Sequence, residues 1–134
     1  MTSPISHEAA EKWARSLYEQ SVDRKDAAGF AKVFAPNGSL RFGNNPPLVG
    51  RAEIESAIGQ FFQAMASLRH EFVAISCDGD MVFLEAKVTY TRHDAATVTV
   101  PAMTVFVMAN AANLCAQECR IYVDLAPLFA PTQN

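Results

Sequence analysis

Apolar residues recur at two different spacings along this chain, and the change comes near residue 68. Up to that point the spacings are three and four residues, which is typical of one face of an amphipathic helix. They predict helices over about residues 4–22, over residues 27–35 and from about residue 51. Ser3 and Pro4 are expected to start the first helix, and Asp26 is expected to cap the second. The Pro-Asn-Gly sequence at 36–38 is expected to end the second helix.

After residue 68 the period becomes two, which is typical of strands with one buried face. Strands are predicted over about residues 70–76, 81–92, 97–110 and 114–124, joined by short turns. A short strand is also expected at 38–42, followed by a loop at 43–50 that is rich in Asn and Pro. Pro101 lies inside a predicted strand, which indicates an edge position or a bulge there.

This order of elements predicts an α+β domain in which a curved antiparallel sheet packs on three N-terminal helices. The concave side of such a sheet, covered by helices, tends to leave a pocket. On the last strand, alternation places Cys115, Cys119 and Ile121 on the inner face. The same alternation places Tyr122 and Asp124 on an outer face, which we expect to form a contact between two copies.

Charge and composition exclude several classes of partner. The net charge is −3 and no run of Lys or Arg exceeds two residues, so we expect no nucleic-acid binding. No stretch resembles a signal peptide or a membrane span, which makes a cytoplasmic protein the expectation. The three cysteines form no C-x-x-C motif, and no Gly-rich phosphate loop is present. We therefore expect no metal and no cofactor.

Four stretches, residues 22–42, 48–62, 69–72 and 119–129, resemble the nuclear-transport-factor-2-like superfamily, especially its SnoaL-like, polyketide cyclase-like branch. The resemblance extends over about residues 8–130 and implies one SnoaL-like domain, 1–134, folded as a cone-shaped α+β barrel with a deep hydrophobic pocket. It also implies a homodimer through the sheet face. The superfamily includes cyclases, isomerases, epoxide hydrolases, dehydratases and domains without catalytic activity, so the fold alone leaves the function open.

The sequence fits some branches of this superfamily better than others. The carboxylate base of ketosteroid isomerases would fall near Phe42, and their oxyanion acid near Thr104, where this chain has no acid. A local resemblance to scytalone dehydratase-like proteins is closer. Asp23 is similar to their helix-end acid, and His70 is similar to their strand-start histidine. The active-site tyrosines of those proteins correspond to Val22 and Phe42 here.

His70 and Asp23 are therefore the candidate catalytic residues. A neutral imidazole can exchange a proton near neutral pH, and a neighbouring carboxylate can orient it. Each residue also has a structural alternative, since His70 could bond a backbone group at a strand end and Asp23 could cap the second helix. Asp124 is a possible third catalytic acid, and its alternative is an ion pair with Arg120 at an interface.

Apolar side chains on the inner positions imply a small apolar or aromatic ligand. The residues expected to bind it are Trp13, Leu17, Tyr18, Phe42, Phe62, Tyr90, Met103 and Phe106. Two functions stay open. One is a cofactor-independent lyase, isomerase or cyclase that uses His70 with Asp23. The other is a noncatalytic ligand-binding or dimerisation domain of the same fold.

Overall fold

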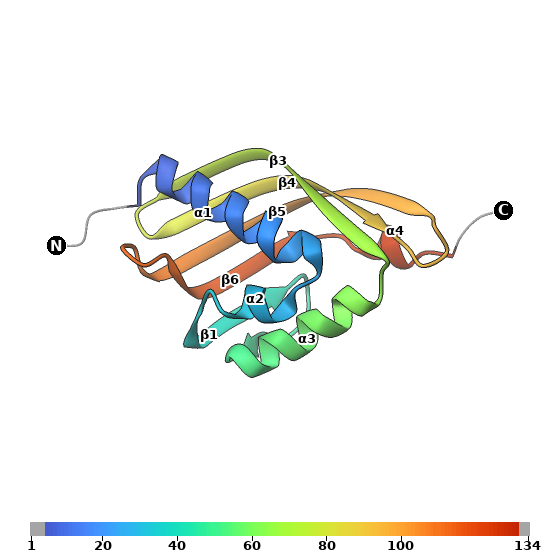
Figure 1. Cartoon of the computed structure of the whole chain (residues 1–134), viewed down its shortest axis with the longest axis horizontal. Helices are drawn as coiled ribbons and strands as arrows, with labels where there is room; N and C mark the ends of the chain where they lie inside the picture. The colour runs from blue at the N-terminus through green and yellow to red at the C-terminus, as the bar shows by residue number, and fades with distance from the viewer. Residues whose placement is uncertain (1–4, 132–134) are drawn as a thin grey trace.

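The computed structural model describes residues 5–131, in which helices pack on a curved six-stranded sheet (Figure 1). The helices are α1 (His7–Gln20), the 3-10 helix η1 (Val22–Arg24), α2 (Ala27–Ala31), α3 (Arg51–Gln63) and α4 (Ala126–Phe129). The strands are β1 (Phe34–Phe42), β2 (Leu48–Val49), β3 (Ser67–Asp78), β4 (Met81–Thr91), β5 (Thr97–Asn110) and β6 (Cys115–Val123). The predicted α+β class is confirmed, and α1, α2 and α3 all precede the antiparallel strands β3 to β6.

The strand order in the sheet is β2-β1-β6-β5-β4-β3. Strands β3 to β6 form the predicted antiparallel meander. Strand β1, in contrast, pairs with β6 in parallel, so the sheet is mixed, and it stays open instead of closing into a full barrel. This pairing sets Phe42 of β1 beside Ile121 of β6.

Helix α1 begins three residues later than expected and leads into a short connection that holds the site. Ser6 is its N-cap, and the Oγ atom of Ser6 accepts the Ala9 N–H at 3.1 Å. The expected cap at Ser3 and Pro4 lies outside the described residues. After η1, Lys25 adopts a left-handed conformation with φ of 58°, and its Nζ donates to the Met65 carbonyl at 3.0 Å. This bond ties the connection to the chain that follows α3.

The second helix is shorter than the sequence predicts. It ends at Ala31, and the chain is already extended at Phe34, where β1 begins. The Pro-Asn-Gly sequence at 36–38 lies inside β1, where the register with β6 shifts between Phe34 and Ser39. Phe30 and Phe34 are buried, and their ring centroids lie 5.4 Å apart. A helix that continued through residue 34 would bury both rings as well, so the pairing of β1 with β6 selects the strand.

A β-bulge divides β3 into two segments. Before it, Leu68, His70 and Phe72 pair with inward-facing residues of β4. The register shifts between Phe72 and Ala74, and the extra residue Val73 is 55% exposed. A bulge bends the strand and resets the alternation, so that inward positions are even-numbered before it and odd-numbered after it. The segment before the bulge, which carries His70, is therefore bent relative to the segment after it.

The alternation predicted for β4 holds along its length, and that of β6 holds only in part. Val82, Leu84, Ala86, Val88 and Tyr90 are all buried. On β6, Cys119 is fully buried as expected, but Ala116 takes the buried place near the strand start that alternation assigned to Cys115. The cause is the shifted register between β5 and β6 from Val107 to Asn110.

Pro101 lies in β5 without a bulge against β4, where it pairs with Lys87. Strand β6 pairs with β5 only from Ala102 onward. Pro101 thus stands at a local edge, where its missing N–H removes no bond to β6.

The outer face of the sheet is mixed in character. Met103 and Tyr122 are paired neighbours on it, with exposed side chains, and Arg120 forms an ion pair with Glu118 at 2.6 Å. A homodimer through this face stays a prediction. None of the helices within residues 5–131 is long and apolar enough to cross a membrane.

Candidate functional site

Asp23 and His70 meet although they lie 47 residues apart in the sequence. The Oδ1 atom of Asp23 is 2.7 Å from Nδ1 of His70, and Oδ2 accepts the backbone N–H of His70 at 3.1 Å. Helix η1 supplies the acid and β3 supplies the histidine. Both side chains are mostly buried, with 20% of Asp23 and 12% of His70 exposed. One carboxylate therefore fixes both the ring and the backbone of His70.

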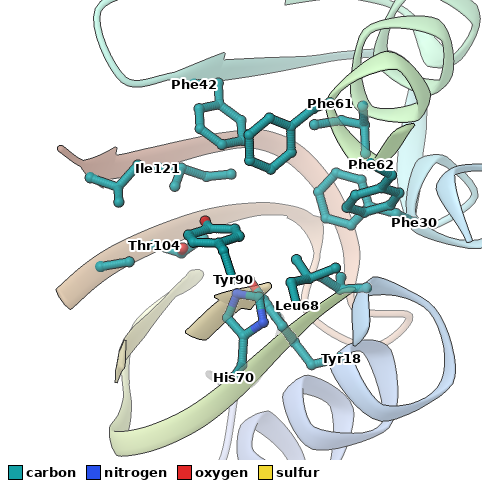
Figure 2. A pocket seen from close by; sticks show the side chains of 14 residues that line it. Tyr18, Phe30, Phe42, Phe61, Phe62, Leu68, His70, Tyr90, Thr104 and Ile121 are labelled. Atoms are coloured by element: carbon teal, nitrogen blue, oxygen red, sulfur yellow. The ribbon is translucent and has the colours of Figure 1, made fainter. Parts of the chain in front are cut away.

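This contact decides which ring nitrogen of His70 can react. An ionised carboxylate only accepts hydrogen bonds, so Nδ1 must carry the hydrogen that the Asp23 contact requires. In the neutral ring Nε2 is then an unprotonated acceptor. Figure 2 shows the imidazole directed from β3 toward the cavity described next. The arrangement thus suits a general base whose reactive atom is Nε2.

The histidine lies at the wall of an otherwise apolar cavity between the helices and the sheet. Rings from β1, α2 and α3 face it across this space (Figure 2). The volume open to solvent-sized molecules is about 40 Å³. The lining residues are Tyr18, Val22, Phe30, Phe42, Ile58, Phe61, Phe62, Leu68, His70, Tyr90, Ala102, Thr104, Ile121 and Val123.

Tyr18 holds the His70 ring from the α1 side. The two rings pack edge to face at 4.6 Å, and Tyr18 makes a similar contact with Phe72 at 5.2 Å. Burial raises the pKa of Tyr18 well above its ordinary value, while hydrogen bonding with Thr104 opposes this shift. Tyr18 therefore stays a neutral phenol at the cavity wall.

A second opening meets the same pair from outside. Asp23 and His70 also line a polar cleft of about 330 Å³, together with charged residues of α1 and β3. These charged residues are Arg15, Glu19, Arg69 and Glu71. The dyad of Asp23 and His70 thus lies between an apolar cavity and a charged surface cleft.

Tyr90 is the second phenol in the cavity. Burial raises its pKa from 10.0 to about 12, so it remains a hydrogen-bond donor at neutral pH. The unfolded chain releases this proton at lower pH than the folded chain, so stability falls as the pH rises between these two values.

We expect the free energy of unfolding to fall by up to about 1.4 kcal/mol per pH unit for each such tyrosine in this range. The measurement is urea unfolding at a series of alkaline pH values. Tyr90→Phe should make the decline shallower. Tyr122→Phe, at an exposed position on the outer face, is the control. An equal slope in Tyr90→Phe and the wild type would contradict the assigned role of Tyr90.

The structure brings half of the expected ligand-binding residues to the cavity. Tyr18, Phe42, Phe62 and Tyr90 line it. The other four lie outside this cavity. Trp13 is partly buried and packs its ring edge-on against the buried Phe106 at 4.9 Å. Leu17 is buried and, like Trp13, lines a separate groove beside α1, and Met103 lies on the outer sheet face. Whether the four lining residues bind a ligand stays a prediction.

Asp124 does not join the dyad. Its Oδ1 accepts the Ala126 N–H at 3.0 Å, so it starts the turn into α4. The expected partner Arg120 bonds Glu118 instead. Asp124 is exposed, and its position indicates a structural role at the end of β6.

Several lining residues were missed in the sequence, and Thr104 is the most informative. It is a polar residue on β5 that is only 6% exposed and reaches the cavity. The alternation of Ala102, Thr104 and Phe106 could have placed it on the inner face. Ile121 and Val123 share the inner face predicted for β6, and both reach the cavity.

Asp26 and Asp23, which the sequence could not separate, have different roles. Asp26 caps α2, and its Oδ1 accepts the Gly29 N–H at 3.0 Å. We expect Asp26→Ala to lower the free energy of unfolding by about 1 kcal/mol because it removes an N-cap. Chemical denaturation measures this loss, and a loss below about 0.3 kcal/mol would contradict the capping role.

Within the part of the chain that the structure describes, no group of three or more His, Cys, Asp or Glu side chains is arranged to hold a metal ion. The polar groups that reach the cavity are His70, Thr104 and the two tyrosines. The cavity therefore offers proton donors and acceptors within an apolar surface.

A family model for the SnoaL-like domain matches residues 14–113, which includes Asp23, His70 and most of the cavity wall. The chain belongs to the SnoaL-like domain family. This finding agrees with the fold and with the resemblance seen in the sequence. No curated protein matches this SnoaL-like protein.

Solved structures similar to this SnoaL-like protein share its fold at low sequence identity. One is a protein assigned as a SnoaL-like polyketide cyclase from Jannaschia sp. CCS1, with a TM-score of 0.75 and 21% identity over 98% of this chain and 99% of that one. Another is an NTF2-like protein of unknown function from Burkholderia pseudomallei K96243, with a TM-score of 0.77 and 17% identity over 92% and 95% of the two chains. A third is SalBIII, an epoxide hydrolase/cyclase-like enzyme of pyran ring formation in salinomycin, with a TM-score of 0.75 and 15% identity over 90% and 95%.

Proposed function

We propose that this SnoaL-like protein catalyses a proton transfer on a small apolar carbonyl compound without a cofactor. His70 is the general base, and Asp23 is the residue that positions it. The observation that carries the proposal is the 2.7 Å contact between Asp23 Oδ1 and His70 Nδ1 at the wall of an apolar cavity. A structural histidine needs neither a buried carboxylate on Nδ1 nor a ring that lines a cavity.

The reaction begins when Nε2 of His70 takes a proton from the carbon next to the carbonyl. The electrons of that C–H bond form an enolate, and the negative charge moves to its oxygen. The Tyr90 hydroxyl, neutral at this pH because burial raises its pKa to about 12, can donate a hydrogen bond to this oxygen. The Asp23 carboxylate stabilises the imidazolium that forms.

The same proton then completes the step in one of three ways. Its return to the far carbon of an enolate conjugated with a C=C bond shifts that double bond, which is an isomerase reaction. Attack of the enolate carbon on a second carbonyl carbon of the same molecule closes a ring and sends the carbonyl π electrons to oxygen, which takes the proton from His70, and this is a cyclase reaction. Its delivery to a leaving hydroxyl group gives water and an unsaturated product, which is a lyase reaction. All three outcomes use one base, and the apolar lining keeps bulk water away from the enolate.

The test needs no knowledge of the natural substrate. Methyl ketones exchange the hydrogens beside their carbonyl in D₂O, and proton NMR follows the loss of signal. We expect the protein to accelerate this exchange by about 10²-fold or more over buffer at equal pH, as expected for a positioned base. Binding without acceleration would support the noncatalytic alternative and contradict the proposal.

The alternative function is ligand binding by the same cavity. Twelve of the fourteen lining residues are apolar or aromatic, and the other two are His70 and Thr104. Such a lining suits an apolar ligand for a catalytic and for a noncatalytic protein. The polyketide and polyether chemistry in the names of two structural neighbours supports an apolar, oxygen-bearing ligand for either function.

A further inference from the structure

The cavity beside His70 is too small for a ring-sized ligand as it stands. Its volume is about 40 Å³. A water molecule needs roughly 10–15 Å³ on this scale, and a cavity of about 150 Å³ is known to hold benzene. The present space therefore accommodates a carbonyl group with one or two carbons. Any larger molecule must extend through the cavity wall.

Among the described residues, two parts of that wall have open space behind them. Tyr18 and His70 border the charged cleft, which does not suit an apolar chain, and the second space is apolar. A groove of about 490 Å³ lies between the loop after β1, helix α3 and helix α4. It shares Phe42, Ile58 and Phe61 with the inner cavity. Ile58 is 4% exposed and fixed in the core, whereas Phe42 and Phe61 are half-buried. The two phenylalanine rings thus form the partition between cavity and groove.

The partition consists of side chains, and the backbone beside Phe42 is held in place. The ring centroids of Phe42 and Phe61 are 4.9 Å apart with an interplanar angle of 55°, so they pack on each other in this structure. The Phe42 carbonyl is held by the backbone N–H and the side-chain amide of Asn45, at 3.1 and 2.9 Å. Rotation of the side chains toward the groove would join the two spaces.

The groove itself selects for an uncharged apolar group. Of the described residues that line it, Asn45 alone is polar, and its amide is already bonded to Phe42. The remaining lining is Phe42, Pro46, Pro47, Leu48, Ala57, Ile58, Phe61, Leu125 and Phe129. Phe129, which is 60% exposed, adds an apolar ring to the edge of the groove.

We propose that the groove is a second subsite of the same binding site and that the ligand is an elongated molecule. Its compact carbonyl end lies at His70, and an apolar chain passes between Phe42 and Phe61 into the groove. This inference rests on the proposed function for the carbonyl end. The observation that carries the inference is that Phe42 and Phe61 line both the cavity and the groove.

The test is the affinity of a series of methyl alkyl ketones, from methyl ethyl to methyl heptyl ketone, measured by calorimetry on the wild-type protein. We expect the affinity to increase about fourfold for each added methylene, because each buried methylene contributes about 0.8 kcal/mol. Equal affinity across the series, or no binding by any member, would overturn the inference.

Ala57→Trp provides the matched variant, because residue 57 lines the groove and not the inner cavity. We expect this variant to bind the shortest ketone as the wild type does and to lose the increase with chain length. Ala52→Trp, at an exposed position on the same helix, is the control and should keep the increase. If Ala57→Trp does not fold, Pro46→Trp fills the groove from the opposite wall. The inference is overturned if the folded groove variant shows the same increase in affinity with chain length as the wild type. It is also overturned if the substitution changes the mass of the assembly in solution, because the groove would then be a contact between copies.

His70→Gln separates this inference from the proposed function. It removes the base and leaves the groove intact, so we expect it to lose proton exchange and keep the increase in affinity with chain length. A wild-type protein that shows the chain-length increase without exchange would contradict the proposed reaction alone. Exchange without the increase would contradict the groove alone.

Discussion

Replacement of His70 by glutamine is expected to slow the exchange of ketone α-protons by a factor of about 10² to 10⁴, which is the usual contribution of a positioned general base. Glutamine has nearly the same length and can still bond Asp23, but its amide has no basic nitrogen at neutral pH. The ring contact with Tyr18 at 4.6 Å is lost as well, so the fold must be checked by thermal unfolding. Proton NMR in D₂O measures the rate.

Asp26→Ala is the control for this variant, since it lowers stability through the cap of α2 and leaves the dyad in place. It should exchange ketone protons at the wild-type rate at a temperature where both proteins are folded. A His70→Gln protein that is folded and exchanges as fast as the wild type would show that the base is another group.

Asp23→Asn is expected to reduce the exchange rate by a similar factor, on the order of 10³, through the tautomer of His70. The carboxylate accepts two hydrogen bonds, from the backbone N–H and from Nδ1 of His70. An asparagine has one acceptor oxygen, and the fixed backbone N–H takes it. The amide NH₂ then faces Nδ1 and donates to it, which moves the ring hydrogen to Nε2. Nε2, the base in the proposed reaction, is then protonated and cannot take a proton.

Nitrogen-15 NMR of the histidine ring distinguishes this mechanism from a simple loss of packing. The wild type should show the hydrogen on Nδ1 at neutral-ring pH, and Asp23→Asn should show it on Nε2. A variant with slow exchange and an unchanged tautomer would contradict the positioning role. The exchange rate and the tautomer are expected to change together.

The sequence was sufficient to predict the meander of β3 to β6, because alternation on β4 is regular over its whole length. It was misleading for residues 27–42. Apolar residues at 30, 33 and 34 suit either a helix face or a helix followed by a strand, and the choice depends on pairing with β6, more than 70 residues later. The bulge after Phe72 and the shifted start of β6 are likewise set by partner strands.

The site was predictable as residue types and only in part as geometry. Asp23 and His70 could be singled out by resemblance, but their contact depends on how η1 lies against β3. Trp13 and Phe106 are aromatic, as pocket residues often are, yet they pack on each other outside the cavity. Met103 is an apolar residue on a largely apolar strand, and only the register of β5 shows that it faces outward.

The second hydrogen bond of Asp23 also affects how the protein behaves in concentrated solution. In the sheet formed by residues 5–131, strand β3 has a neighbour on one side alone, so the backbone groups on its other side could recruit a strand from another molecule. Asp23 occupies one of these groups, the N–H of His70, with a charged side chain. The carboxylate that orients the ring thus also protects against intermolecular strand pairing, and its loss would expose the chain to aggregation at the point where the chemistry is proposed.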